Sequence, residues 1–241
     1  AYARGLAAAA ISAGASVFTG SAATSFKRAG NRWRVETATG AVTADWIVIG
    51  TDAYGTGPWL PIRQEQVHLP YFNLATTPLS DNVRHSILPE RQGVWDTKEI
   101  LSSFRFDQAG RLVFGSVGAL RNTGIAIHRA WAKRAMKRLF PQIGEIKFEA
   151  EWYGMIGMTS DNLPRFHQLD TNVIAICGYN GRGIAPGTTF GRVIAEHVLG
   201  RLDTAAMPLP VTPVQSQSFI GVKQFYYEAG AQAAHLVSDR F

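Results

Sequence analysis

The sequence predicts a mixed fold, with an α/β part built on a buried sheet and an α+β part built on an antiparallel sheet. Two apolar runs, at 46–50 and 173–176, are typical of strands covered on both faces. Between them lie aromatic-rich segments separated by turns, which favour an antiparallel sheet. With 241 residues, 46% of them hydrophobic and 17% charged, the chain has ample material for packed cores.

The first fifty residues predict a helix, an antiparallel meander and a buried strand. Residues 2–13 are good helix formers, and Gly14 stops them. Further strands are expected at 16–18, 23–28 and 33–37, with turns at 29–31 and 39–40. The chain then continues through 42–45 into the apolar strand at 46–50.

Beyond Pro58 the pattern becomes that of an antiparallel sheet with one long helix. The strands are expected at 67–76, 93–96, 101–106, 111–116 and 147–153. The turn at 107–110 predicts a hairpin between two of them. The helix is expected over 125–140, because Pro141 cannot continue it. A last helix is predicted at 222–236, after a tail that contains three prolines.

The strongest local signal is a strand at 173–176, a glycine-rich loop at 178–183 and a helix from Pro186 to Leu199. Glycines let the backbone approach a ligand closely, and a helix start offers free N–H groups to an electron-rich atom. The loop is not the dinucleotide-binding fingerprint, because Pro186 stands where the third glycine would be. By itself the pattern fits either a structural turn or a ligand cradle.

Charge excludes some classes of function. The net charge is +6, and the densest basic stretch, 128–139, predicts a helix with a solvated basic face. The apolar residues expected on its other face are Ile127, Trp131, Ala135 and Leu139. Because no base-reading motif accompanies the basic residues, a nucleic-acid partner is not expected.

The number and spacing of the cysteine and histidine residues exclude disulfides and argue against a metal site. Cys177 is the only cysteine, so internal disulfides are excluded and a reducing compartment, the cytoplasm, is expected. The six histidines are scattered without the spacing of metal ligands, and no metal site is expected. No apolar run approaches the roughly 18 residues of a membrane span.

Several motifs together resemble a known family. They are Gly178 to Ala185 with the following helix, Trp152-x-Gly154, Met158-Thr159-x-Asp161-x-Leu163-Pro164, Tyr2 to Leu6 and Gly50 to Tyr54. This combination resembles the FAD-dependent amine and amino-acid oxidoreductases of the D-amino acid oxidase-like (DAO) family. Within the family, it is most similar to the gamma-glutamylputrescine oxidoreductase-like branch. The resemblance extends over nearly the whole chain.

The resemblance implies an incomplete FAD-binding, Rossmann-like domain interleaved with an antiparallel-sheet substrate domain. The FAD part would comprise 1–54 and 171–202, the substrate domain 55–170, and the carboxy-terminal tail and helix 203–241. FAD would be noncovalent, because Gly154 lies where covalent members carry a cysteine. The cofactor-binding residues implied are Ala22, Ala23, Gly50, Thr51, Gly154, Asn180, Gly181, Arg182, Gly183, Ile184 and Ala185.

The implied reaction is hydride transfer to the flavin from the carbon bearing a neutral amine, followed by hydrolysis of the imine. The chemistry depends on the cofactor and on orientation, so no catalytic side chain is assigned. The substrate-binding residues expected are Tyr71, Phe104, Trp152, Tyr153, Ile156 and Tyr179. Relatives that oxidise small α-amino acids commonly have an arginine at the position of Ile156, which favours a larger amine here. Arg105, Asp96 and Arg182 are either polar anchors or surface charges.

The family's amino-terminal strand, G-x-G-x-x-G turn and helix do not occur in this sequence. Three hypotheses follow: a fragment of a longer protein, a partner chain that completes the FAD site, or a noncatalytic binding or interaction module that retains the fold. The first is the simplest of the three.

Overall fold

The structure is a computed structural model, and it describes residues 2–240. The α-helices are α1 Tyr2–Ser12, α2 Leu60–Gln64, α3 Asp81–Ile87, α4 Thr123–Leu139, α5 Ile184–Val198 and α6 Ile220–Val237. The strands are β1 Ala23–Ala29, β2 Arg32–Thr37, β3 Ala41–Ala44, β4 Ile47–Ile49, β5 Val67–Thr76, β6 Val94–Trp95, β7 Ser102–Phe106, β8 Leu112–Val117, β9 Phe148–Met158, β10 Arg165–Asp170 and β11 Val173–Cys177.

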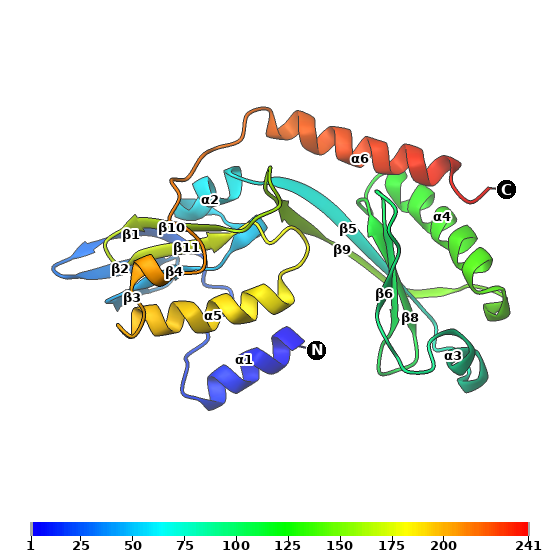
Figure 1. Cartoon of the computed structure of the whole chain (residues 1–241), viewed down its shortest axis with the longest axis horizontal. Helices are drawn as coiled ribbons and strands as arrows, with labels where there is room; N and C mark the ends of the chain where they lie inside the picture. Colours follow the sequence, from blue (N-terminus) through cyan, green and yellow to red (C-terminus); the bar gives the residue numbers. More distant parts are fainter. Residues whose placement is uncertain (1, 241) are drawn as a thin grey trace.

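Within the described residues these strands form three sheets, ordered β1-β2-β3, β10-β11-β4 and β6-β7-β8-β5-β9. The two small sheets lie together at one end of the molecule with α1 and α5, and the five-stranded sheet lies at the other end with α3 and α4 (Figure 1). The long strands β5 and β9 run between the two ends, and α6 passes over them (Figure 1). The mixed class predicted from the sequence is confirmed.

The sheet β10-β11-β4 combines one parallel and one antiparallel pairing. β4 runs parallel to β11, and β10 runs antiparallel to it. The side chains of alternate β11 residues belong to two different hydrophobic cores. Val173 packs with Trp33 and Trp59, whereas Ile174 packs with residues of α5. β11 is therefore covered on both faces, as predicted. The prediction that both faces are covered is wrong for β4, because one face is open and its Val48 is 47% exposed.

The five-stranded sheet has β5 between β8 and β9. β9 is longer than the predicted 147–153 and reaches Met158, because it pairs with β5 along nearly its whole length, from Val67 opposite Met158 to Thr76 opposite Phe148. The pairing places Gly154 opposite Tyr71 and Ile156 opposite Leu69. The Trp-x-Gly motif therefore lies within a strand.

Helix α4 covers this sheet, and the core between them contains Phe72, Phe114, Trp131 and Met136. Trp131 and Ala135 are buried as expected, but Leu139 is 43% exposed and His128 is buried instead. Two basic residues of α4 form ion pairs with other parts of the chain, Arg129 with Glu151 and Arg138 with Asp239.

Some local predictions are wrong. Residues 16–18 form a loop rather than a strand, because no neighbouring strand pairs with them. Strand β10 and the short helices α2 and α3 were not predicted from the sequence. No helix among residues 2–240 has the length and apolarity needed to cross a membrane.

Candidate functional site

A cavity with a volume of about 930 Å³ lies between the five-stranded sheet and the glycine-rich loop. This volume falls in the range of roughly 300 to 1,000 Å³ that is typical of small-molecule sites. Of the residues predicted from the sequence, the cavity is lined by Tyr71, Ile156, Asn180, Gly181 and Arg182. The fold thus brings predicted substrate residues and predicted cofactor residues to one space.

The sheet side of the cavity is formed by residues of β5, β7, β8 and β9. The Tyr71 hydroxyl lies 2.7 Å from the Ser103 hydroxyl, in a hydrogen bond that either can donate. Burial raises the pKa of Tyr71 above its usual 10, so the phenol is neutral at physiological pH. Ile156 lies against the glycine loop, since a Cβ added at Gly181 would be 3.3 Å from its Cδ1 atom. This side offers an apolar surface with one hydroxyl pair.

The glycine loop is held by hydrogen bonds to the end of β9. The backbone N–H of Asn180 donates to the Gly157 carbonyl at 3.1 Å, and the Asn180 side-chain oxygen accepts from the Thr159 N–H at 2.9 Å. Asn180 has φ 52° and Gly181 has φ 78°, a left-handed conformation that glycine and asparagine adopt readily. The loop is therefore fixed relative to the cavity.

Helix α5 begins directly after the loop, at Ile184. The first N–H groups of a helix have no partner within it, so those of Ile184 and Ala185 are free for another acceptor. Both residues are exposed, Ile184 to 71%. Arg182 is also exposed, and none of the ion pairs within residues 2–240 includes it. The helix start can thus hold an electron-rich group such as a flavin carbonyl.

The other predicted cofactor residues lie on the turn after β4, on β1 and on β9. Gly50 has open space beside it, and the Thr51 hydroxyl is buried without a hydrogen-bond partner in the described residues. Ala22 is exposed and Ala23 is half-buried at the start of β1. Gly154 lies under the Tyr54 side chain, whose oxygen would be 2.9 Å from an added Cβ.

Four predicted substrate residues lie outside the cavity lining. Phe104 packs in the core with Phe114 and Phe140. Trp152 and Tyr153, on the edge strand β9, are 45% and 37% exposed. Tyr179 packs against Phe190, and burial raises its pKa to about 12.

Of the three predicted polar anchors, Asp96 and Arg182 line the cavity and Arg105 does not. The Asp96 carboxylate accepts hydrogen bonds from Lys98 N–H, Ser102 N–H and the Ser102 hydroxyl, so most of its acceptor sites are already used. Its role is to hold the loop that precedes β7.

Most residues of that loop were not predicted from the sequence to line the site. Besides the predicted residues, the lining comprises Leu69, Trp95, Thr97, Lys98, Glu99, Leu101, Ser103, Val117 and Met158. The one available signal was the polar run 96–99 between two strands, since ligand contacts are often made by loops held on a rigid sheet.

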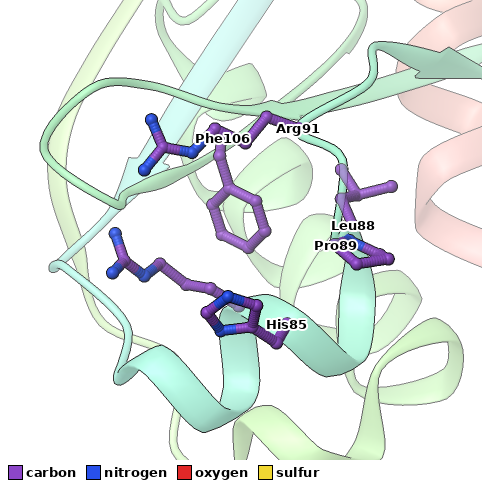
Figure 2. A pocket seen from close by; sticks show the side chains of 6 residues that line it. His85, Leu88, Pro89, Arg91 and Phe106 are labelled. Atoms are coloured by element: carbon purple, nitrogen blue, oxygen red, sulfur yellow. The ribbon is translucent and has the colours of Figure 1, made fainter.

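A second, much smaller cavity of about 40 Å³ lies beside α3. Figure 2 shows His85, Leu88, Pro89, Arg91 and Phe106 around it. A water molecule occupies roughly 30 Å³ in the liquid, so this space holds about one water and no substrate.

A family model described as FAD dependent oxidoreductase (DAO) matches residues 1–197. The chain belongs to the DAO family. FAD is the cofactor of this family, and the resemblance inferred from the motifs is confirmed.

Two curated proteins illustrate the relationship. The probable oxidoreductase OrdL of Haemophilus influenzae is 30% identical over 208 residues, which cover 83% of this chain and 46% of that protein. The gamma-glutamylputrescine oxidoreductase of Escherichia coli is 29% identical over 169 residues, covering 69% and 39% respectively. The chain thus spans about half the length of the curated relatives it matches.

Solved structures of DAO-fold flavoenzymes show the same fold. Glycine oxidase from Geobacillus kaustophilus superposes with a TM-score of 0.63 at 20% identity, covering 87% of this chain and 56% of that one. Iminodiacetate oxidase from Chelativorans sp. BNC1 superposes with a TM-score of 0.66 at 16% identity, covering 87% and 59%.

Proposed function

We propose that this chain provides the substrate cavity and the flavin-facing loop for FAD-dependent oxidation of an amine or amino-acid derivative. The observation that carries the proposal is the cavity of about 930 Å³ whose wall includes Gly181 and Arg182 of the glycine loop. When bound, FAD supplies the hydride acceptor, and the imine formed from the amine is hydrolysed by water. The proposed domain division, 1–54 with 171–202 and 55–170, would place this cavity where the two parts meet.

The residues at the loop fit a noncovalently bound flavin. The N–H groups of Ile184 and Ala185 have no partner within the helix, and both residues are exposed, so these groups can donate to a flavin carbonyl and stabilise negative charge there. Cys177 is fully buried, and Gly154 offers no nucleophile for a covalent link. Gly50, Thr51, Ala22 and Ala23 are proposed to contact the adenosine part.

The cavity itself supports a substrate larger than a small amino acid. Ile156 provides an apolar surface where an arginine would pair with a carboxylate. Tyr71 and Ser103 add a neutral hydroxyl pair that can orient an amine by accepting one of its N–H groups.

We further propose that more chain completes the FAD site, either from a preceding segment of a longer protein or from a partner. Among the described strands β4 pairs only with β11, which leaves its other edge open. Helix α1 buries none of its residues, and its Leu6 and Ile11 are about half exposed. A short helix gains most of its stability from packing, so these apolar residues support a missing contact.

Titration of FAD with the purified chain tests the cofactor proposal, with flavin absorbance and fluorescence as the readout. We expect a weak but saturable change in the visible flavin bands. Ala185→Asp should weaken binding about tenfold or more, because a carboxylate at this helix start repels the electron-rich flavin edge while it stabilises the helix itself. Thr189→Asp, one turn further along α5, is the matched control and should leave flavin affinity within about twofold.

One result of the FAD titration would contradict the cofactor proposal. If the flavin spectrum does not change at any protein concentration, the cofactor proposal is wrong. The alternative, a noncatalytic binding or interaction module that retains the fold, then takes its place.

A further inference from the structure

Three residues with metal-ligating side chains converge in the interior, on the side of β11 away from α5. Glu65 directly follows α2, His167 lies on β10 and Cys177 ends β11. One ligand atom of each lies within 4.8 Å of the others. His167 and Cys177 have no exposed surface, and Glu65 is 5% exposed. No metal site was expected from the sequence, because the histidines lack the spacing of metal ligands and Glu65 lies about a hundred positions before the other two residues.

The orientation of His167 is set by the carboxy-terminal tail. Its Nδ1 atom lies 2.8 Å from the carbonyl oxygen of Thr212, which can only accept a hydrogen bond, so Nδ1 carries the proton. In the neutral ring the Nε2 atom therefore presents a lone pair to the cluster. A histidine that ligates a metal commonly donates its other N–H to a backbone carbonyl in this way.

Electron-rich atoms face that lone pair from two sides. Nε2 lies 2.8 Å from Glu65 Oε2 and 3.8 Å from Cys177 Sγ. Within the described residues, Glu65 Oε2 is buried and has no hydrogen-bond partner. Two lone pairs 2.8 Å apart in the interior repel each other, so the arrangement requires a cation between them, either a proton or a metal ion.

We propose that Glu65, His167 and Cys177 bind a divalent metal ion of the Zn²⁺ type. A thiolate, an imidazole and a carboxylate are the ligands that zinc uses in proteins, at about 2.0 to 2.3 Å from the metal. Ligand atoms around a tetrahedral zinc are then about 3.3 to 3.8 Å apart, so metal binding requires the 2.8 Å Glu65–His167 contact to open and keeps the 3.8 Å His167–Cys177 separation. The Glu65 and Cys177 ligand atoms lie within 4.8 Å of each other and must also come into this range. A fourth position remains for water.

The surrounding charges leave the proposed site available. Arg165 approaches Glu65 from its other oxygen, with Nε 3.9 Å from Oε1, and a second nitrogen of Arg165 lies 2.9 Å from Asp161. Glu65 Oε2 therefore stays free to face the cluster. A bound metal would connect α2, β10, β11 and, through His167, the tail at Thr212. Since Cys177 directly precedes Gly178, it would also anchor the start of the glycine loop.

Metal binding by the whole chain tests this proposal. Because the cluster is buried, the protein is unfolded in urea with a chelator and refolded with Zn²⁺ or Co²⁺ before dialysis. We expect about one zinc per chain, and in the cobalt form a thiolate-to-cobalt charge-transfer band in the near ultraviolet. Cys177→Ala should abolish this band, and His167→Gln should weaken metal binding by at least the roughly 10- to 100-fold that the loss of an outer-shell partner costs.

The exposed His85 provides the matched control, and His85→Gln should bind zinc like the unaltered chain. Refolding of the unaltered protein without a bound metal or a charge-transfer band would overturn the proposal, as would zinc binding that is unaffected by Cys177→Ala and His167→Gln. In the first case a proton shared by Glu65 and His167 occupies the site. The cobalt spectrum of the unaltered chain needs no variant, so a variant that fails to fold leaves the proposal testable.

Discussion

The carboxylate of Asp52 accepts a hydrogen bond of 2.7 Å from the backbone N–H of Gly178. This contact joins the turn after β4 to the first residue of the glycine loop, 126 positions later in the chain. Asp52 has φ 44°, a left-handed conformation, and burial raises its pKa above the usual 3.8. This side chain therefore adds a contact beyond the ends of β4 and β11, which are already paired through their backbones.

Substitution of Asp52 should show how much this contact contributes. Asp52→Ala should lower the free energy of unfolding by about 1 to 3 kcal/mol, because it leaves the Gly178 N–H without an acceptor. Asp52→Asn should cost about 1 kcal/mol or less, since asparagine keeps the acceptor and tolerates the left-handed backbone. Urea unfolding at pH 7 measures both. Asp45→Ala, which removes an exposed ion pair with Arg32, should cost less than about 1 kcal/mol. Equal losses in both Asp52 variants would contradict this view of the contact.

Gly178 itself should resist substitution for two separable reasons. Its φ is +76°, and an added Cβ would lie 2.4 Å from Thr159 Cγ2. Gly178→Ala should therefore cost about 2 to 5 kcal/mol, as backbone strain plus overpacking. The double variant with Thr159→Ser removes the clashing methyl group and should recover about 1 to 3 kcal/mol.

Gly20 is the matched control for the backbone component, because its φ is +65° with open space around it. Gly20→Ala should cost only about 1 to 2 kcal/mol in urea unfolding. If Thr159→Ser recovers nothing in the Gly178→Ala background, the steric explanation is wrong.

The histidine pair between α4 and α6 predicts a pH-dependent stability. The Nδ1 atoms of His128 and His235 lie 2.8 Å apart, and burial lowers the two pKa values to about 4 and about 3. As the pH falls below about 6.5, the unfolded chain takes up protons that the folded chain does not. The free energy of unfolding should then decrease by up to about 1.4 kcal/mol per pH unit for each histidine that stays neutral when folded. Above about pH 6.5 the pair contributes no pH dependence.

Urea unfolding of the unaltered chain and of two variants between pH 4 and pH 8 measures this slope. His128→Gln should reduce the slope between pH 4 and pH 6 by about one histidine's contribution, or 1.4 kcal/mol per pH unit. His85→Gln should leave the slope unchanged, because His85 is exposed. A slope that His128→Gln does not alter would show that the pair titrates normally.

Ile156 should determine which amines enter the cavity, a prediction that rests on the proposed function. In the FAD-loaded protein, Ile156→Trp should raise the KM of bulky amines about tenfold more than that of small ones, because the larger ring occupies space beside Gly181. Leu163→Trp is the control, since Leu163 is 56% exposed and outside the cavity lining. Steady-state kinetics with amines of increasing length would detect the difference. Equal effects on all amines would contradict a steric role for Ile156.

Local patterns in the sequence predicted the elements that depend on local chemistry. The glycine loop before α5 was recognisable because left-handed backbone needs glycine or asparagine at 178, 180 and 181. Helix α4 was recognisable from its apolar spacing, and its end from Pro141. The strand predicted at 16–18 was wrong, because a strand also requires a neighbour to pair with.

The sequence by itself determined the DAO family and the mixed fold. It also determined the strand, loop and helix of the proposed flavin site, because each of these features depends on residues that are close together in the chain. The tertiary structure alone decided which of the predicted residues meet: Tyr71 and Ile156 reach the cavity, whereas Phe104 is in the core. It also decided the contact of Glu65 with His167, and that of His128 with His235. These contacts join residues about a hundred positions apart, and only the pairing of strands and the packing of helices bring such residues together.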